Sequence, residues 1–252
     1  MKIAILIPTT SKYRDTWKTS KDTYLYSICV STFLKQLSKS DSNHTYCFYV
    51  GYDHDDRIFS NKKEHEIFYA ITKTIPNISF QFIQFHAIPK GYLTKMWNIL
   101  CKKAYDDKCN YFYQCGDDIS FRTSNWVSDC INTLKTSDDV GITGPLNNNK
   151  YILTQIFVSR KHIDIFGYLF PEEIINWCCD DWINSLYLPK HHFVLKNHFA
   201  RNENDDCRYD INGDRNFIKH GENYTEKLDK LKDFVHTIVN RDKLILEKYL
   251  SR

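Results

Sequence analysis

An uninterrupted apolar run near the start of the chain, residues 3–7, is the feature that most restricts the fold. The run contains only isoleucine, alanine and leucine, and it stops at Pro8. A strand that is apolar on both faces is buried on both faces, which is typical of a parallel sheet covered by helices on each side. We therefore expect this segment to be an interior strand.

Strand-like and helix-like segments alternate over the next hundred residues. The predicted strands are 46–50, ended by Gly51, then 78–85 and 111–115. The predicted helices are 24–37, 64–74 and 93–104, and each has an apolar stripe on one side. This alternation predicts an α/β fold, with a mixed, mostly parallel sheet flanked by helices.

The pattern is less regular beyond residue 120. We expect a helix over 126–134, a turn over 141–145, a strand over 152–158 and a helix over 177–187. Residues 201–215 are polar without periodicity, so we expect a mobile loop there that serves as a lid. An apolar stripe from residue 225 predicts a terminal helix, followed by a second helix around 244–250.

Two units follow from this reading of the chain. A main domain is expected over residues 1–218 and a C-terminal helical extension over residues 219–252. The extension either packs on the main domain or mediates a homodimer.

The charge balance excludes one class of partner. The chain has 34 Lys and Arg against 31 Asp and Glu, a formal net charge of +3, and its basic residues are interleaved with acidic ones. A dedicated nucleic-acid binder carries a basic stripe, so no nucleic-acid partner is expected.

Cysteine usage and hydropathy indicate the compartment. The nine cysteines include no CxxC pair, which favours reduced thiols in an intracellular protein. The first apolar run is too short for a signal peptide, and no stretch approaches the ~20 apolar residues of a membrane span. We expect a soluble, cytoplasmic protein with no membrane span. A scarcity of alanine beside abundant lysine, asparagine and isoleucine suggests an AT-rich genome, viral or microbial.

The acidic doublet Asp117–Asp118 follows a predicted interior strand. Two carboxylates in that place incur desolvation and mutual repulsion unless a cation or hydrogen bonds compensate. Mg²⁺ and Mn²⁺ prefer carboxylate oxygens and complete their coordination with water and substrate phosphates. The doublet thus indicates a metal and diphosphate site, the alternative being a capping role.

A second doublet, Asp180–Asp181, lies between Trp177-Cys178-Cys179 and Trp182. Partial burial among these neighbours raises a carboxylate pKa toward the range of a general base. The alternative is a structural acid pair at a helix N-terminus, with the tryptophan in the core. The residue types alone leave both readings open.

Four motifs in order resemble the nucleotide-sugar-dependent glycosyltransferases of the GT-A fold. Residues 5–10 are similar to the first strand and base-binding loop of that fold. Residues 90–98 and 111–119 resemble the family 2 pattern of a glycine, a helix with a basic residue and Asn, and a strand ending in Asp-x-Asp. Residues 116–119 and Asp180-Asp181-Trp182 also resemble segments of the Golgi N-acetylglucosaminyltransferases. The resemblance spans about residues 1–200.

The resemblance implies a metal-dependent transfer of a hexose or N-acetylhexosamine from a nucleotide-diphosphate sugar, with a UDP-sugar favoured. The acceptor is a hydroxyl of a glycan or another molecule. The residues implied in binding the donor are Thr9, Thr10, Tyr13, Asp53 and Asp117, with Lys90 and Lys95 in place of the family's helix arginine.

The resemblance also implies the metal ligands and the base. Asp118 would bind Mn²⁺ or Mg²⁺, and His198 would be a further ligand, with His191 and His192 as alternatives. Asp181, paired with Asp180, would take the proton from the acceptor in a single displacement that inverts the anomeric centre. Gly116 stands where the family has the first acid of its motif.

Two other functions fit parts of the pattern. A catalytically inactive carbohydrate-binding or assembly module would keep the fold without turnover. A sugar nucleotidyltransferase would share the sheet and the metal, but it needs a glycine-rich loop after the first strand, and residues 8–12 contain no glycine.

Overall fold

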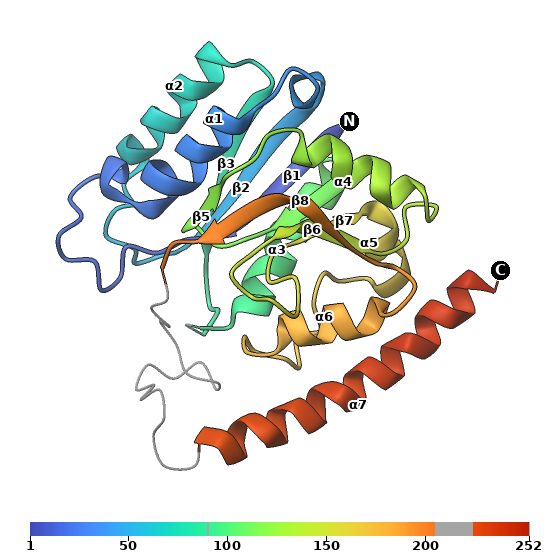
Figure 1. Ribbon diagram of the computed structural model, residues 1–252. Helices are drawn as coiled ribbons and strands as arrows, with labels where there is room; N and C mark the ends of the chain where they lie inside the picture. The colour runs from blue at the N-terminus through green and yellow to red at the C-terminus, as the bar shows by residue number, and fades with distance from the viewer. Residues whose placement is uncertain (90, 205–223, 252) are drawn as a thin grey trace.

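The computed structural model describes residues 1–89, 91–204 and 224–251, and strands within them form one twisted sheet (Figure 1). Eight strands of these residues take the order β3-β2-β1-β4-β7-β6-β8-β5. The strands are β1 (Lys2–Pro8), β2 (Thr45–Asp53), β3 (Ile78–Phe85), β4 (Tyr111–Gln114), β5 (Ile119–Phe121), β6 (Ile142–Leu146), β7 (Ile156–Ser159) and β8 (His192–Asn202). The α-helices are α1 (Ser31–Gln36), α2 (Glu66–Thr74), α3 (Leu93–Asp106), α4 (Trp126–Lys135), α5 (Arg160–Phe166), α6 (Cys179–Tyr187) and α7 (Tyr224–Leu250), and a π-helix, η2 (Leu25–Val30), directly precedes α1.

The sheet has a parallel half and a mixed half. Strands β1 to β4 run parallel in the order β3-β2-β1-β4, whereas β7 is antiparallel to β4 and to β6. Strand β8 is parallel to β6 and antiparallel to β5. The chain winds outward from β1 toward β3 and then returns to β4 on the other side. The gap between β1 and β4 is therefore the switch point of strand order, where α/β sheets bind their ligands. The α/β fold with a mixed, mostly parallel sheet is confirmed.

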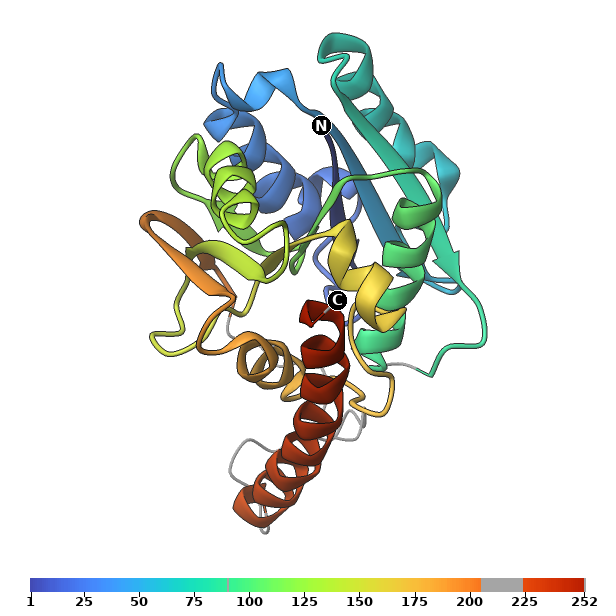
Figure 2. The same ribbon diagram turned by 90° about the vertical axis from the view of Figure 1, so that its right-hand side faces the viewer.

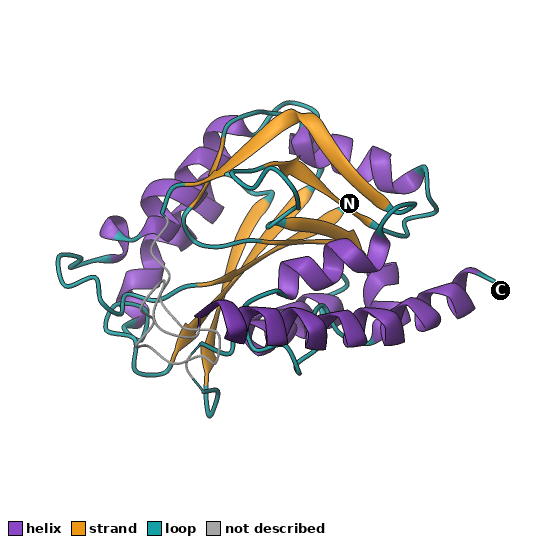
Figure 3. Ribbon diagram, turned by 60° about the horizontal axis from the view of Figure 1, so that its bottom comes forward, coloured by secondary structure: helices purple, strands orange, loops and turns teal. Residues whose placement is uncertain are grey.

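Helices cover both faces of the sheet, as the first apolar run predicted (Figure 3). Alternate residues of β1 enter different cores: Ile3, Ile5 and Ile7 pack with α1, α2 and α4, while Ala4 and Leu6 pack with α3, α5, α6 and α7. All five side chains are completely buried. The two-sided core explains why the run is apolar without alternation.

Helix α7 is a single long helix that lies across α5 and α6 (Figures 1 and 2). Val235, Ile238, Val239 and Leu246 are buried in the same core as α3 and α6. The prediction of two terminal helices is wrong, because Tyr224–Leu250 is one helix in which the buried Leu246 continues the stripe of Val235, Ile238 and Val239. The predicted domain boundary at residue 218 lies outside the described residues.

Two glycine-based expectations are also wrong. Gly51 does not end the second strand, since β2 continues to Asp53. A Cβ at Gly51 would come 2.1 Å from Cζ of Phe85, so the glycine makes room for a ring of the neighbouring strand. The expected turn over 141–145 is strand β6, in which Gly144 packs closely against the Gln155 carbonyl.

Candidate active site

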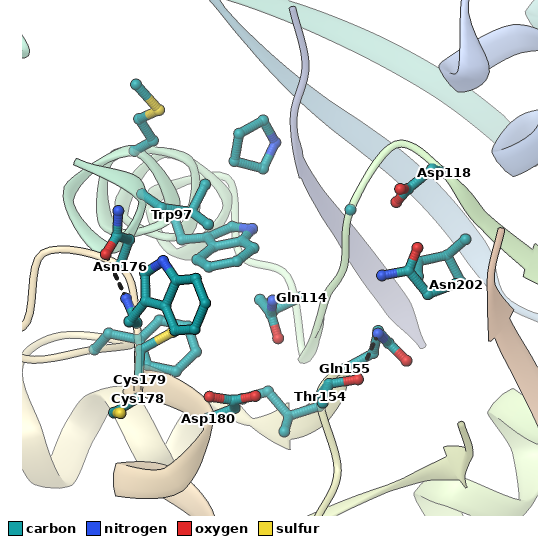
Figure 4. Close-up of a pocket in the computed structure, with 18 of the residues that line it drawn as sticks. Trp97, Gln114, Asp118, Thr154, Gln155, Asn176, Cys178, Cys179, Asp180 and Asn202 are labelled. Atoms are coloured by element: carbon teal, nitrogen blue, oxygen red, sulfur yellow. Dashed lines mark hydrogen bonds between the residues drawn. The ribbon is translucent and has the colours of Figure 1, made fainter. Parts of the chain in front are cut away.

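A cavity of about 760 Å³ opens at the carboxyl ends of β1, β2 and β4, at the switch point of the sheet. Helices α3, α6 and α7 and the segments before β7 and after β8 supply its other walls. Figure 4 shows part of this lining. Seven of the residues that the sequence suggested for the site line the cavity: Thr9, Thr10, Asp53, Asp117, Asp118, Asp180 and Asp181.

The loop after β1 is tied to the loop after β4. Thr9 donates from its backbone N–H to Gly51 O at 2.8 Å, and from Oγ1 to Asp117 Oδ2 at 2.7 Å. Both side chains are buried. The hydrogen bond fixes the two strand ends across the switch point, so one face of the cavity is held in a defined shape.

Asp56 organises the same loop from behind. Its carboxylate accepts hydrogen bonds from Ser11 N at 2.7 Å, Ser11 Oγ at 2.9 Å and Thr10 Oγ1 at 3.2 Å. It also accepts the backbone N–H groups of Ile58 and Phe59. With this many donors, hydrogen bonds from the protein replace the water that the Asp56 carboxylate loses on burial. Asp56 thus positions the β1 loop, a role that the sequence alone had not distinguished from that of Asp53.

Asp118 occupies space that a side chain at position 116 would need. A Cβ on Gly116 would lie 2.7 Å from Asp118 Oδ1. Gly116 stands where the family has the first acid of its motif, and here the Asp118 carboxylate fills the space beside it. In Figure 4, Asp118 lies on the side of the cavity where Asn202, at the end of β8, also projects.

The wall opposite is a segment pinned to α3. Asn98 accepts the N–H groups of Leu169 and Phe170 and donates to Phe170 O at 2.7 Å. One turn earlier, Thr94 Oγ1 donates to Ile174 O at 2.5 Å. These contacts hold the chain that leads into α6 against the helix. Asn98, the asparagine of the predicted helix motif, thus joins α3 to the 169–170 segment by hydrogen bonds.

The carboxylates of Asp180 and Asp181 enter the cavity from the first turn of α6. The Asp180 carboxylate accepts the Asp181 N–H at 3.1 Å, and Asn184 holds its backbone carbonyl at 2.8 Å. Burial, followed by the charge of Asp181, raises the pKa of Asp180 to about 6. Burial also raises the pKa of the neighbouring Cys178 thiol to about 12, so this thiol is protonated at neutral pH.

Helix α7 reaches the cavity and also fixes α6. Leu228 and Lys232 belong to the cavity lining. Further along α7, the completely buried Asp242 accepts hydrogen bonds from Trp182 Nε1 and from the Tyr168 hydroxyl, both at 3.1 Å. Trp182 directly follows the Asp180–Asp181 pair, so α7 anchors the helix that carries it.

The charge of the cavity is strongly acidic. The described lining residues include five aspartates and a single cation, Lys232. A diphosphate entering this space is repelled unless a cation accompanies it. Within the described part of the chain, no group of three His, Cys, Asp or Glu side chains is close enough to hold a metal. Asp118 could serve as the one protein ligand of such a cation, with water and phosphate oxygens as the others, if the cation is Mg²⁺ or Mn²⁺.

Three of the residues that the sequence suggested for donor binding are not among the described residues of this lining. The structure describes Tyr13 and Lys95, but they do not line the cavity. Lys90 lies outside the described residues. The expected lid over 201–215 begins as strand β8, and residues 205–215 are likewise not described.

His198 is hydrogen-bonded to two residues that are not in the described lining of the cavity. In the middle of β8, its Nε2 lies 2.8 Å from Asp129 Oδ2 and its Nδ1 lies 3.2 Å from Thr123 Oγ1. His198 is not among the described residues that line the cavity, and its role as a metal ligand stays a prediction.

Together, the fold and cavity have the arrangement of a GT-A-like α/β protein, with an acidic pocket at the β1/β4 switch point. No family model and no curated protein matches the sequence. Solved structures do share the fold. The Staphylococcus aureus protein TarS, residues 1–349 in complex with UDP, is 16% identical with a TM-score of 0.50, over 80% of this chain and 60% of TarS 1–349. The same TarS fragment with UDP-GlcNAc gives 15% identity and a TM-score of 0.52, over 82% and 60%.

These comparisons establish the fold and not the activity of this chain. The chain spans about 60% of the length of the TarS 1–349 structures that it matches. None of the helices in the described residues combines the length and apolar composition needed to cross a membrane.

Proposed function

We propose that this protein is a glycosyltransferase that moves a sugar from a UDP-sugar to a hydroxyl of a glycan or another acceptor. Two facts support the proposal: the shared fold with TarS, which was solved with UDP and UDP-GlcNAc, and the position of the cavity at the switch point of the sheet.

The two pairs of carboxylates in the cavity are the strongest support for the proposal. Two carboxylate pairs line the same cavity from different elements, Asp117–Asp118 at the end of β4 and Asp180–Asp181 at the start of α6. Sugar transfer needs a counter-charge for the leaving diphosphate and a base for the acceptor hydroxyl. The cavity offers carboxylates in two places for these two tasks.

Residues of the β1 and β4 loops would bind the nucleotide. Thr9 and Thr10 would lie against the base, Asp53 would hydrogen-bond it, and Asp117, held by Thr9, would reach the ribose. Asp118 would bind Mg²⁺ or Mn²⁺, which when bound neutralises the diphosphate and stabilises it as the leaving group.

The carboxylate pair of α6 would accept the acceptor's proton. Asp180 is the stronger candidate on physical grounds, because its pKa of about 6 keeps it ionised at neutral pH yet makes it more basic than an ordinary aspartate. The resemblance favours Asp181 instead. In either case the deprotonated hydroxyl attacks the anomeric carbon, the bond to the diphosphate breaks, and a single displacement inverts the configuration.

Separate Asp180→Asn and Asp181→Asn variants test this assignment. The base variant should bind UDP-sugar with unchanged affinity and lose about 10²- to 10⁴-fold in kcat, because only proton removal is affected. Calorimetry gives the affinity, and release of UDP in the presence of acceptor hydroxyls gives kcat.

Asp106→Asn is the matched control, since Asp106 is an exposed aspartate at the end of α3 that pairs with Lys102. Near-normal kcat in both α6 variants would contradict the proposed base. Sugar or acceptor binding without any turnover in the unmodified protein would indicate a binding module in place of an enzyme.

A further inference from the structure

Strand β3 forms one edge of the sheet and has none of the features that protect edge strands. It pairs with β2 over all eight residues without a bulge, and no other strand of the described residues lies on its outer side. Its sequence, Ile-Ser-Phe-Gln-Phe-Ile-Gln-Phe, contains no charged residue, proline or glycine. Natural proteins protect an edge with charges, prolines, bulges or a very short strand, because an exposed edge is a template for pairing.

The opposite edge of the sheet is protected in the usual way. Strand β5 is only three residues long. Arg122 follows it directly and forms an ion pair with Glu203, so charged side chains lie beside this short edge. The lack of protection is therefore specific to β3.

The outer backbone groups of β3 belong to Phe80, Phe82 and Gln84. Asn77 O accepts from Tyr46 N at 2.7 Å, so the backbone groups of every second residue from Asn77 onward face β2. The groups of the three even-numbered residues face outward, because successive residues of a strand alternate in this respect. No hydrogen bond joins these groups to another described residue. Strand β2 is buried after its first residue, whereas most residues of β3 are half-buried or exposed, so this edge lies at the surface.

Helix α2 has a self-complementary surface beside the same edge. The ring of Tyr69 lies 6.0 Å from that of Phe82, and Tyr69 is 42% exposed. Glu66 and Lys73 are exposed three positions before and four positions after Tyr69, so all three lie on one side of the helix. Two such helices that lie side by side in opposite directions bring Glu66 of each beside Lys73 of the other.

We propose that this edge binds a second copy of the chain, through antiparallel pairing of the two β3 strands about a two-fold axis at Phe82. Phe82 then faces Phe82 of the second copy, Phe80 faces Gln84, and each facing pair exchanges two backbone hydrogen bonds. Because the strand carries no charge, pairing with itself brings no like charges together. The same axis places the two α2 helices side by side in opposite directions, which sets Glu66 against Lys73.

This pairing leaves both cavities open. The cavity lies at the carboxyl ends of the parallel strands, and antiparallel pairing turns these ends in opposite directions in the two copies. Helix α7 lies away from α2 (Figures 1 and 2), so it takes no part in the contact. The inference therefore does not depend on the proposed function.

Sedimentation velocity of the full chain, from micromolar to submillimolar concentration, tests the contact. The unmodified protein should form a discrete dimer, and Gln84→Pro should weaken it at least about tenfold, because an outward hydrogen bond is lost twice per dimer. The Gln84 N–H does not bond to β2, and edge strands tolerate proline at such positions. Tyr69→Lys should also weaken the dimer, by placing like charges at the two-fold axis, and it replaces Gln84→Pro if that variant does not fold.

A charge exchange tests the orientation of the two copies. Glu66→Lys and Lys73→Glu each set like charges against one another and should weaken the dimer, whereas the double variant should restore its affinity. Within one helix the two residues are seven positions apart and are not neighbours, so restoration reports a contact between copies. No restoration would contradict the antiparallel arrangement.

Leu244→Lys is the control, because Leu244 is a 67% exposed apolar residue of α7. A dimer that Leu244→Lys disrupts and the β3 and α2 variants spare would overturn the proposal. A monomer at every concentration would do the same. So would an open series of larger assemblies, because two-fold pairing uses up the exposed β3 edge of each copy.

Discussion

Asp180 shows two opposing influences on one carboxylate. It lies in the first turn of α6, where the helix dipole and a backbone N–H favour the ionised form. Burial and the adjacent Asp181 oppose ionisation more strongly, and the pKa rises to about 6. A purely structural acid at a helix N-terminus would have a lowered pKa, so the shift favours a chemical role.

The pH dependence of turnover should report this carboxylate. Below pH 6 Asp180 is protonated and cannot accept a proton, so kcat should rise with pH and level off above about pH 7. The pH profile of kcat from 4.5 to 8 measures the rising limb, which Asp180→Asn should lack. A flat profile for the unmodified protein would exclude Asp180 as the base.

The raised pKa of Asp180 also makes folding stability depend on pH, and it favours the native fold at low pH, where turnover should be slow. A raised pKa means that the folded state binds the proton more tightly than the unfolded chain does. The stabilisation from this group is therefore present below its unfolded pKa, near 4, and is lost as the pH rises through about 6. Above about pH 6 Asp180 thus destabilises the native fold.

Substitution of Asp118 should affect only the part of UDP binding that depends on the metal. Asp118→Asn is expected to abolish the gain in UDP affinity that Mn²⁺ gives, because a neutral amide is a poor ligand and the acidic cavity then repels the diphosphate. Calorimetry with and without Mn²⁺ measures the gain. Asp129→Asn is the control, since Asp129 pairs with His198 outside the lining. An unchanged Mn²⁺ effect in Asp118→Asn would show that Asp118 is not the ligand.

At the scale of the elements, α7 and α6 are joined by a buried hydrogen bond and share one core. Asp242 is completely buried and joins Trp182, Tyr168 and the exposed Arg241, whose Nε lies 2.8 Å from Asp242 Oδ1. Arg241 also pairs with Glu173 at 2.6 Å. A buried carboxylate is retained only where such donors replace its hydration. This network sets the position of the α6 N-terminus relative to the sheet.

Removing this carboxylate should destabilise the protein strongly. Asp242→Ala leaves the Trp182 N–H without its acceptor in the core, and the free energy of unfolding should fall by about 3 kcal/mol. Urea unfolding followed by tryptophan fluorescence measures the change. Asp233→Ala, at an exposed position of the same helix, should change stability by less than about 0.5 kcal/mol. Similar effects of the two substitutions would contradict the anchoring role of Asp242.

At the scale of the whole molecule, local patterns were enough to predict the parallel half of the sheet. The segment 78–85 is strand β3, and the run from residue 3 lies within β1. Parallel strands end at one edge of a sheet, and the resemblance implied that polar residues near the ends of β1, β2 and β4 bind one donor. The structure places Thr9, Asp53 and Asp117 around one cavity.

Features that depend on distant contacts could not be predicted in this way. Gly51 and Gly144 resemble breakers until their close neighbours, Phe85 and the Gln155 carbonyl, are known. Asp56 gains its importance from Ser11, 45 positions away. Lys232 reaches the cavity only because α7 folds back over α6. The sequence shows no local signal for any of these contacts.

The bond between Trp182 and Asp242 joins residues 60 positions apart, which orders events during synthesis. Asp242 leaves the ribosome after the residues of the sheet and of α6, and until α7 packs the Trp182 indole N–H lacks this acceptor. Arrival of α7 supplies the acceptor and brings Leu228 and Lys232 to the cavity at the same time. A chain interrupted before α7 would therefore lack, at the same time, the part of the core that α7 completes and two residues of the cavity lining.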